Sequence, residues 1–139
     1  MSELLQLTFW ATFLSAAVRT AIPILCASIG EDISEKAGII NVGLEAVMLV
    51  GAFFGFAAAY LTRSLFWGFV VGMLAGMLLS LLHAFLSVYL KQDQNVAGVA
   101  LNLPATGLTS YIFQLMVNRY GIPQIETLKS VPIPLLSKI

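Results

Sequence analysis

Charged side chains are rare in this sequence, and two of them stand inside long apolar stretches. Arg19 falls midway through the stretch 4–29, and Glu45 comes early in the stretch 43–61. An ionised side chain at the centre of a membrane costs about 2.5–3.5 kcal/mol on insertion scales, so such residues usually pair or face a cavity. Two kinds of chemistry are therefore open here: an Arg19–Glu45 ion pair, or polar groups along the path of a solute.

Glu45 also has a purely structural interpretation. It would lie in the first turn of a helix, where the N-terminal dipole stabilises a carboxylate by about 0.3–1 kcal/mol. Asn41 just before this helix and Asn102 in the later stretch 96–117 are further polar candidates. Pro104 removes a backbone hydrogen bond near Asn102, and interrupted membrane helices tend to line cavities. We therefore take Asn41, Glu45 and Asn102 as candidates for a solute path, with a buried structural kink as the alternative around Pro104.

The sequence carries no motif that indicates catalysis or nucleotide binding. Gly38 and Gly43 have the outer spacing of a phosphate loop, but Leu and Glu follow where Lys and a hydroxyl residue are needed. The single histidine, His83, has no second ligand at metal-binding spacing, and the single Cys26 excludes an internal disulfide framework. We expect no enzyme, no cofactor and no metal site, and any ATP hydrolysis should occur on a partner.

The elements that position these residues should be membrane helices. The 139 residues are 59% hydrophobic and 10% charged, whereas soluble domains carry about 25% charged residues. A hydrocarbon core of about 30 Å needs about 20 apolar residues, and nothing alternates as β-barrel strands do. We predict an all-α integral membrane protein with about four transmembrane helices in a single region, 1–139. The predicted helices are 4–29, 43–61, 65–90 and 96–117, followed by an irregular tail, 118–139.

Small residues recur at intervals of four in the second and third of these helices. Residues four apart share a helix face, and small ones let a second backbone approach closely. The pattern predicts a packing face, although glycine is also frequent in membrane helices generally. Its members are Gly51 and Gly55 in the second helix, and Gly68, Gly72 and Gly76 in the third.

Three sets of residues, in order along the chain, resemble a known family. The stretch "GEDISEKAGIINVGLEAVMLVGAF" supplies Glu35, Lys36, Gly38, Asn41, Gly43, Glu45, Met48 and Leu49. The stretch "VRTAIPIL" supplies Arg19, Ala21 and Pro23, and a later one supplies His83, Asp93, Gln94, Gly98, Asn102, Gly107 and Thr109. Over about residues 15–125 the chain resembles the permease subunits of bacterial nucleoside and simple-sugar ABC importers, of the branched-chain/ribose type.

This resemblance implies a multi-pass subunit of the bacterial cytoplasmic membrane that forms part of a translocation pathway. Its implied partners are cytoplasmic ATPase subunits, a second permease subunit or copy, an extracytoplasmic substrate-binding protein and the lipid bilayer. Within this resemblance, the residues "NVGLE" at positions 41–45 look closer to the nucleoside branch of the family, which favours nucleosides over pentoses or hexoses. A formal net charge of zero argues against a nucleic-acid partner.

The same resemblance covers only the N-terminal half of such permeases, so the bundle would be incomplete relative to the full fold. The resemblance leaves open whether the chain is a fragment, a truncated product or a split subunit. The segment with which such permeases usually dock on the ATPase has no counterpart in this sequence. The resemblance also places residues 91–94 in the cytoplasm and the tail outside, whereas the charge count alone favours the opposite orientation. Two rival functions stay open: an ion-coupled secondary carrier, and a membrane interaction protein that transports nothing.

Overall fold

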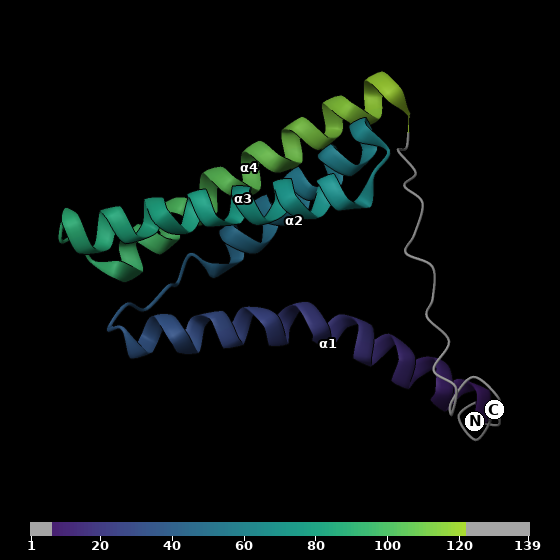
Figure 1. The fold of residues 1–139 in the computed structure, drawn as a ribbon, viewed down its shortest axis with the longest axis horizontal. Coiled ribbons are helices and arrows are strands. Elements are labelled where there is room, and N and C mark those ends of the chain that lie inside the picture. The colour runs from purple at the N-terminus through teal and green to yellow at the C-terminus, as the bar shows by residue number, and fades with distance from the viewer. Residues whose placement is uncertain (1–6, 122–139) are drawn as a thin grey trace.

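The computed structural model describes residues 7–121, and this part of the chain is a bundle of long helices without a β-strand (Figure 1). The helices are α1 (Leu7–Lys36), α2 (Leu44–Thr62), α3 (Leu65–Ala84), its π-helical continuation η2 (Phe85–Tyr89), and α4 (Gln94–Tyr120). Four spans, with α3 and η2 taken as one, are long and apolar enough to cross a membrane. The prediction of an all-α membrane bundle with four spans is confirmed. Of the predicted tail, 118–120 are the last residues of α4, and 122–139 lie outside the described residues.

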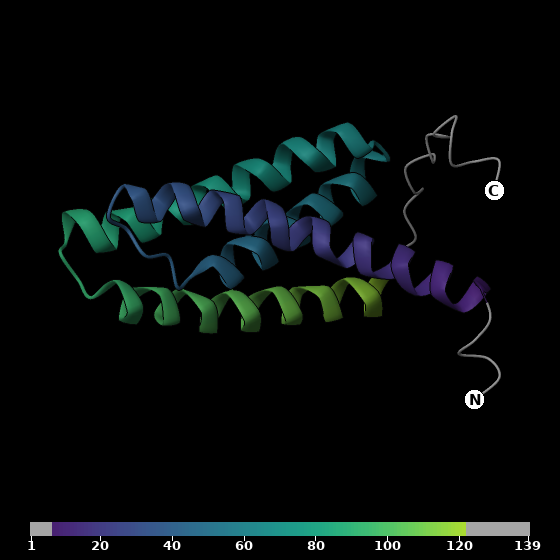
Figure 2. The same ribbon diagram turned by 90° about the horizontal axis from the view of Figure 1, so that it is seen from below.

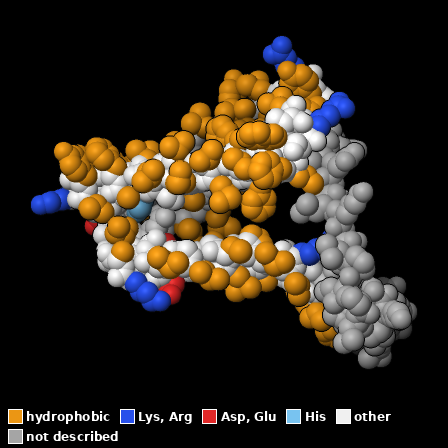
Figure 3. Space-filling model, viewed as in Figure 1, with side chains coloured by type: hydrophobic (Ala, Val, Ile, Leu, Met, Phe, Trp, Pro, Cys, Tyr) orange, Lys and Arg blue, Asp and Glu red, His pale blue; other side chains and the backbone are white. Residues whose placement is uncertain are grey.

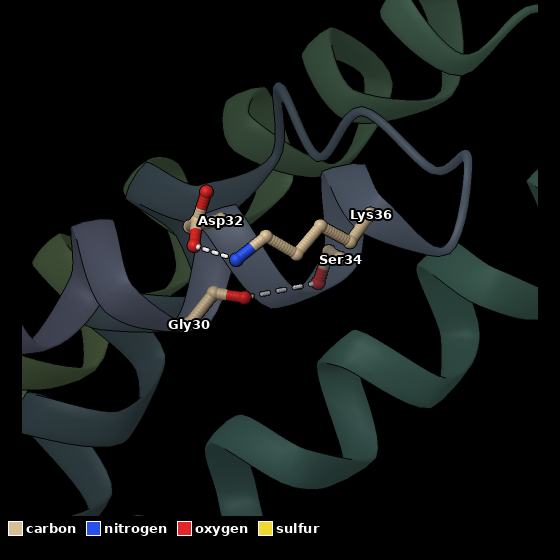
Figure 4. Close-up of polar contacts among 4 residues, drawn as sticks. All are labelled: Gly30, Asp32, Ser34 and Lys36. Atoms are coloured by element: carbon tan, nitrogen blue, oxygen red, sulfur yellow. Dashed lines mark hydrogen bonds and ion pairs between the residues drawn. The ribbon is translucent and has the colours of Figure 1, made fainter.

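The largest difference from the predicted helix boundaries is at the end of α1. The sequence predicts a break after residue 29, but the helix continues through the charged stretch to Lys36. Within this stretch Lys36 Nζ lies 2.7 Å from Asp32 Oδ2, and the hydroxyl of Ser34 donates to the carbonyl of Gly30 (Figure 4). Glu and Lys are good helix formers, and an exposed pair at this spacing contributes about 0.3–0.5 kcal/mol. Polarity marked the end of the apolar stretch here, not the end of the helix.

Gly38 ends α1 because it adopts a left-handed conformation, with φ of 83°. The N–H of Ile39 donates to the carbonyl of Ser34 over 3.0 Å, and the N–H of Gly38 donates to that of Glu35 over 2.9 Å. This pair of bonds is the Schellman arrangement, which satisfies carbonyls at a helix end and favours glycine at that position. The chain leaves α1 in a defined direction as a result.

Helix α2 is the centre of the bundle. It packs antiparallel against α3 on one side and runs parallel to α4 on another, whereas α1 contacts the other helices sparsely (Figures 1 and 2). Few of the described residues are fully buried, and the apolar side chains among them are all alanines: Ala46, Ala59, Ala97 and Ala105. Most large apolar side chains point outward, as expected where lipid is the solvent and helices associate through close packing.

The glycines selected by their spacing lie at the contact between α2 and α3. A Cβ atom added to Gly68 would lie 2.8 Å from the carbonyl oxygen of Gly55, and one added to Gly72 would lie 2.9 Å from that of Gly51. Gly76 is less crowded, since its nearest neighbour would be a Val47 methyl group at 3.6 Å. The backbones of α2 and α3 approach so closely that no side chain fits between them at Gly68 and Gly72.

Two prolines stand inside helices without ending them. Pro23 lies within α1, which bends along its length in Figure 1, and Pro104 lies within the continuous helix α4. Each removes one intrahelical hydrogen bond, because proline has no N–H. Near Pro104 the hydroxyl of Thr106 donates to the carbonyl of Asn102 over 2.9 Å. Helix α4 continues through Pro104 and is long enough to span a membrane.

Candidate functional site

The residues that join α1 to α2, 37–43, form the least regular part of the described chain, and we name them the lead-in segment. Gln94 begins α4 at the same end of the bundle at which α1 ends, but α2 begins deeper (Figure 1). Gly98 and Asn102 contact the end of this segment and the start of α2. They follow Gln94 by four and eight residues, which places them about 6 and 12 Å further along α4. Non-helical backbone therefore runs inward from the end of the bundle, alongside the first part of α4.

Non-helical backbone at membrane depth is stable only where its polar groups find partners, are buried in protein or line a cavity. The side chain of Gln94 supplies two such partners. Its Oε1 accepts a hydrogen bond from the N–H of Ile40 over 2.7 Å, and its Nε2 donates to the carbonyl of Gly38 over 3.3 Å. Asp93 fixes the start of α4 by accepting from the N–H groups of Asn95 and Val96. Gln94 is thereby presented from a capped helix end.

The opposite side of the lead-in segment is held by Glu31 of α1. Its Oε1 accepts a hydrogen bond from the N–H of Asn41 over 2.7 Å. The adjacent N–H groups of Ile40 and Asn41 thus bond to side chains from two different helices. The segment is held from α1 and α4, in the absence of any neighbouring strand among the described residues.

Asn102 of α4 satisfies the beginning of α2. Its Oδ1 accepts from the N–H of Ala46 over 2.9 Å, and its Nδ2 donates to the carbonyl of Val42 over 3.2 Å. The first N–H groups of a helix lack intrahelical partners, and the N-cap residue here, Gly43, has no side chain to offer. Asn102 provides this cap from a different helix.

Two glycines let α4 approach the lead-in segment closely. A Cβ atom on Gly98 would lie 2.6 Å from the backbone nitrogen of Gly43 and 2.8 Å from the carbonyl carbon of Val42. Both glycines are buried. The Asn102 amide can therefore reach the start of α2 because Gly98, one turn earlier on α4, lets the two backbones approach this closely.

The three predicted path residues all lie at this start of α2. Asn41 is half-buried in the lead-in segment, Asn102 caps the helix, and Glu45 is exposed in the first turn. Asn41 Oδ1 and Glu31 Oε2 are enclosed oxygens without a hydrogen-bond partner among the described residues. The structure thus gathers polar groups, most of them acceptors, around one helix start.

Arg19 does not join this cluster, and the predicted Arg19–Glu45 ion pair is not formed. Arg19 precedes Glu31 by twelve residues in α1, which corresponds to about 18 Å along the helix. Its side chain is exposed, and the one ion pair of residues 7–121 joins Lys36 to Asp32. The first turn of α2 lies near the C-terminal end of α1, whereas Arg19 lies near the middle of α1.

Sequence reasoning did not identify Glu31 and Gln94 as site residues. Glu31 stands ten positions from its backbone partner, and Gln94 stands 54 positions from Ile40. Gln94 carried a signal only as one residue of the family resemblance. Neither spacing nor periodicity marks a side chain that bonds to irregular backbone so far along the chain.

His83 and Ser87 form a second buried polar group, in the last part of α3 and in η2. His83 is 2% exposed, and its Nε2 lies 3.4 Å from the hydroxyl of Ser87. No group of three or more His, Cys, Asp or Glu side chains suited to a metal occurs among residues 7–121. His83 is therefore part of helix packing in this structure.

A cleft of about 950 Å³ separates α1 from α2 and α3. Cys26 and Gly30 line it from α1, and the glycine rows of α2 and α3 form much of its other wall. Figure 3 shows hydrophobic side chains on both sides of this gap, with the visible charged groups mainly toward the ends of the bundle. Its apolar walls suit lipid or another helix, whereas the groups that can bind a polar solute lie at the lead-in segment.

Comparison with known proteins gives a family and several relatives. Residues 13–136 match the family described as branched-chain amino acid transport system / permease component. A protein of Haloferax volcanii, provisionally named a glucose ABC transporter permease, is 46% identical over 105 residues, which are 76% of this chain and 32% of that protein. No solved structure matches the chain significantly.

Two further relatives are named for nucleosides. The guanosine ABC transporter permease NupQ of Bacillus subtilis is 33% identical over an alignment that covers 99% of this chain and 46% of NupQ. The nucleoside ABC transporter permease NupC of Lactococcus lactis is 37% identical, with 84% of this chain and 39% of NupC covered. The matches thus span 32% to 46% of the length of these relatives.

Proposed function

Because this chain belongs to the branched-chain amino acid transport system permease family, we propose that it forms part of the solute path of an ATP-driven ABC importer. It is a multi-pass protein of the cytoplasmic membrane, with four spans of suitable length in the described part. The observation that carries the proposal is the lead-in segment, where polar backbone and amide groups lie inward of the end of an otherwise apolar bundle. Such interrupted helices are where membrane transporters commonly bind polar solutes.

The mechanism that fits this site is alternating access. Binding and hydrolysis of ATP on cytoplasmic partner subunits would shift the bundle between outward-open and inward-open states, since a ligand shifts an equilibrium by its differential affinity. Asn41, Glu45 and Asn102 would meet the solute near the start of α2. A second permease subunit or copy and an extracytoplasmic substrate-binding protein would complete the importer.

Nucleosides are the solutes that we propose. The relatives named for guanosine and for nucleosides align with 99% and 84% of this chain. Glucose is the second candidate, because the relative named for glucose has the higher identity, 46%, over a shorter stretch. Both solutes are neutral and rich in hydroxyl donors, which suits a site with the carboxylate of Glu45 and the amide oxygen of Asn41.

The test is transport by the intact complex. The chain would be tagged in its native membrane, purified in mild detergent with its companions, and reconstituted into liposomes. We expect a companion ATPase by mass spectrometry, and uptake of labelled guanosine that requires ATP and competes with other nucleosides. If the complex contains an ATPase but takes up glucose and not guanosine, the proposed solute is a sugar instead of a nucleoside.

The same preparation separates the rival functions. Uptake that an uncoupler abolishes while ATP is held constant would identify an ion-coupled carrier. A well-preserved complex that contains no ATPase and moves no solute would contradict the importer and favour a membrane interaction protein. Uptake that survives the uncoupler but stops when the partner ATPase cannot hydrolyse ATP is the result we expect.

A further inference from the structure

The lead-in segment depends on two side chains that are assigned no role in the solute path. The N–H groups of Ile40 and Asn41 are bonded to Gln94 and Glu31, respectively, each over 2.7 Å. Backbone bonds on either side stay local: Ile39 bonds back to α1, and Leu44 bonds to the carbonyl of Asn41. The position of Ile40 and Asn41 between these turns is therefore set by partners outside the segment.

The two partners come from helices that otherwise meet this segment differently. Helix α1 contacts the rest of the bundle sparsely, so the bond from Glu31 is a specific tie between α1 and the segment. Gln94 uses both ends of its amide, as acceptor from Ile40 and donor to Gly38. Both polar atoms of the Gln94 side chain are thus bonded to the backbone of the lead-in segment.

We propose that Glu31 and Gln94 are positioning residues: together they hold the lead-in segment in one conformation and thereby place Asn41 at the start of α2. The role rests on the proposed function, since solute transport is the activity that the placement serves. Without these two side chains the segment can leave this conformation, and the transport cycle then becomes slower. Their loss removes no contact to the solute.

The bonds are tested first by hydrogen exchange at single amides, in the purified intact complex in lipid nanodiscs. Gln94→Leu should speed exchange at the Ile40 amide and Glu31→Ala at the Asn41 amide, each by about tenfold, which corresponds to about 1.4 kcal/mol. Glu31→Gln keeps an acceptor oxygen of the same reach and should restore slow exchange at Asn41. Each variant should act mainly on its own amide.

Matched controls are available close by, in the connection before α4 and on α1. The side chain of Gln92 donates to the nearby carbonyl of Leu90, and the Glu35 side chain makes no hydrogen bond or ion pair among the described residues. Gln92→Leu and Glu35→Ala make the same chemical changes close by, and both should leave exchange at Ile40 and Asn41 as in the unaltered protein. Equal exchange in the test and control variants would overturn the proposal.

Transport kinetics then separate positioning from solute binding. Because an interaction that acts on the cycle lowers the rate while a solute contact raises KM, Glu31→Ala and Gln94→Leu should lower the maximal uptake rate by at least about threefold with KM little changed. A raised KM at an unchanged maximal rate would show solute contact and contradict positioning, as would unchanged uptake. If the unaltered complex transports nothing, the proposed function fails, while the exchange measurements still decide whether these side chains hold the segment.

Discussion

The contact between α2 and α3 and the contact between the lead-in segment and α4 are both built on glycine, but they differ in what surrounds the glycine. Between α2 and α3, two regular helices meet with Gly51 and Gly55 against Gly68 and Gly72. Against α4, Gly98 meets irregular backbone, and Asn102 and Gln94 bond to that backbone. Close approach serves helix packing in the first region, and it brings amide side chains within reach of open backbone in the second.

This difference separates a purely structural contact from a candidate path. A regular helix satisfies its own backbone, so α2 and α3 need no polar side chain where they touch. The lead-in segment cannot satisfy itself, and it therefore concentrates polar groups at a depth where the rest of the bundle is apolar. Variants of the first region should change stability alone, and variants of the second should also change transport.

The largest effect is expected from Gly72→Leu in the α2–α3 contact. Even a Cβ atom at this position would lie 2.9 Å from the carbonyl oxygen of Gly51, and a leucine must force the helices apart. We expect a loss of about 3 kcal/mol and failure to recover the complex by size-exclusion chromatography. Gly107→Leu is the control, because nothing lies within 4 Å of a Cβ atom on Gly107. Equal loss in both variants would break the comparison.

A smaller effect on stability is expected from Gly98→Ala in the second region. The added methyl group would lie 2.6 Å from the backbone nitrogen of Gly43, which cannot move without shifting the start of α2. We expect a loss of about 2 kcal/mol in thermal unfolding, together with reduced uptake by the protein that remains folded. Gly107→Ala, on the same helix, should change neither. Normal uptake by a destabilised Gly98→Ala protein would show that this contact is also purely structural.

Asn102→Leu removes the cap of α2 without adding bulk to the backbone contact. It leaves the N–H of Ala46 and the carbonyl of Val42 without their partner, and loss of a helix cap costs about 1 kcal/mol. Thermal unfolding of the purified complex measures this loss. Asn95→Leu is the matched control, since Asn95 is exposed at the start of the same helix. Asn102→Asp keeps the acceptor for Ala46 and should recover part of the stability.

Sequence patterns predicted the helices well because hydropathy and small-residue spacing are local properties. The four stretches and the glycine rows could be read within windows of about 20 residues. The end of α1 was predicted seven residues too early, since Glu and Lys are as compatible with helix as with a connecting loop. Gly38, whose positive φ ends the helix, lies well beyond the predicted break, just after the charged stretch.

The candidate site was only partly predictable, because its bonds join distant parts of the chain. Asn41 and Asn102 stood out as polar residues in apolar surroundings, but nothing local showed that Asn102 caps a helix 56 residues earlier. Glu31 lay in a stretch with several other charges, and the family resemblance pointed to Glu35 instead. The possible Arg19–Glu45 ion pair was inferred from the opposite charges of the two side chains, but their positions along α1 and α2 keep them apart.

Glu45 gives the smallest expected change in stability and the sharpest test of the second region. Its side chain is exposed in the first turn of α2 and makes no ion pair with any described residue, so the structural contribution expected of it is that of the helix dipole, about 0.3–1 kcal/mol. If the start of α2 meets the solute, Glu45→Gln should lower uptake markedly in a protein that unfolds at nearly the unaltered temperature. Glu35→Gln, an equivalent change on exposed α1, should leave uptake unchanged. Uptake by Glu45→Gln equal to that of Glu35→Gln would reduce Glu45 to a helix-start carboxylate, and the path would then rest on Asn41 and Asn102 alone.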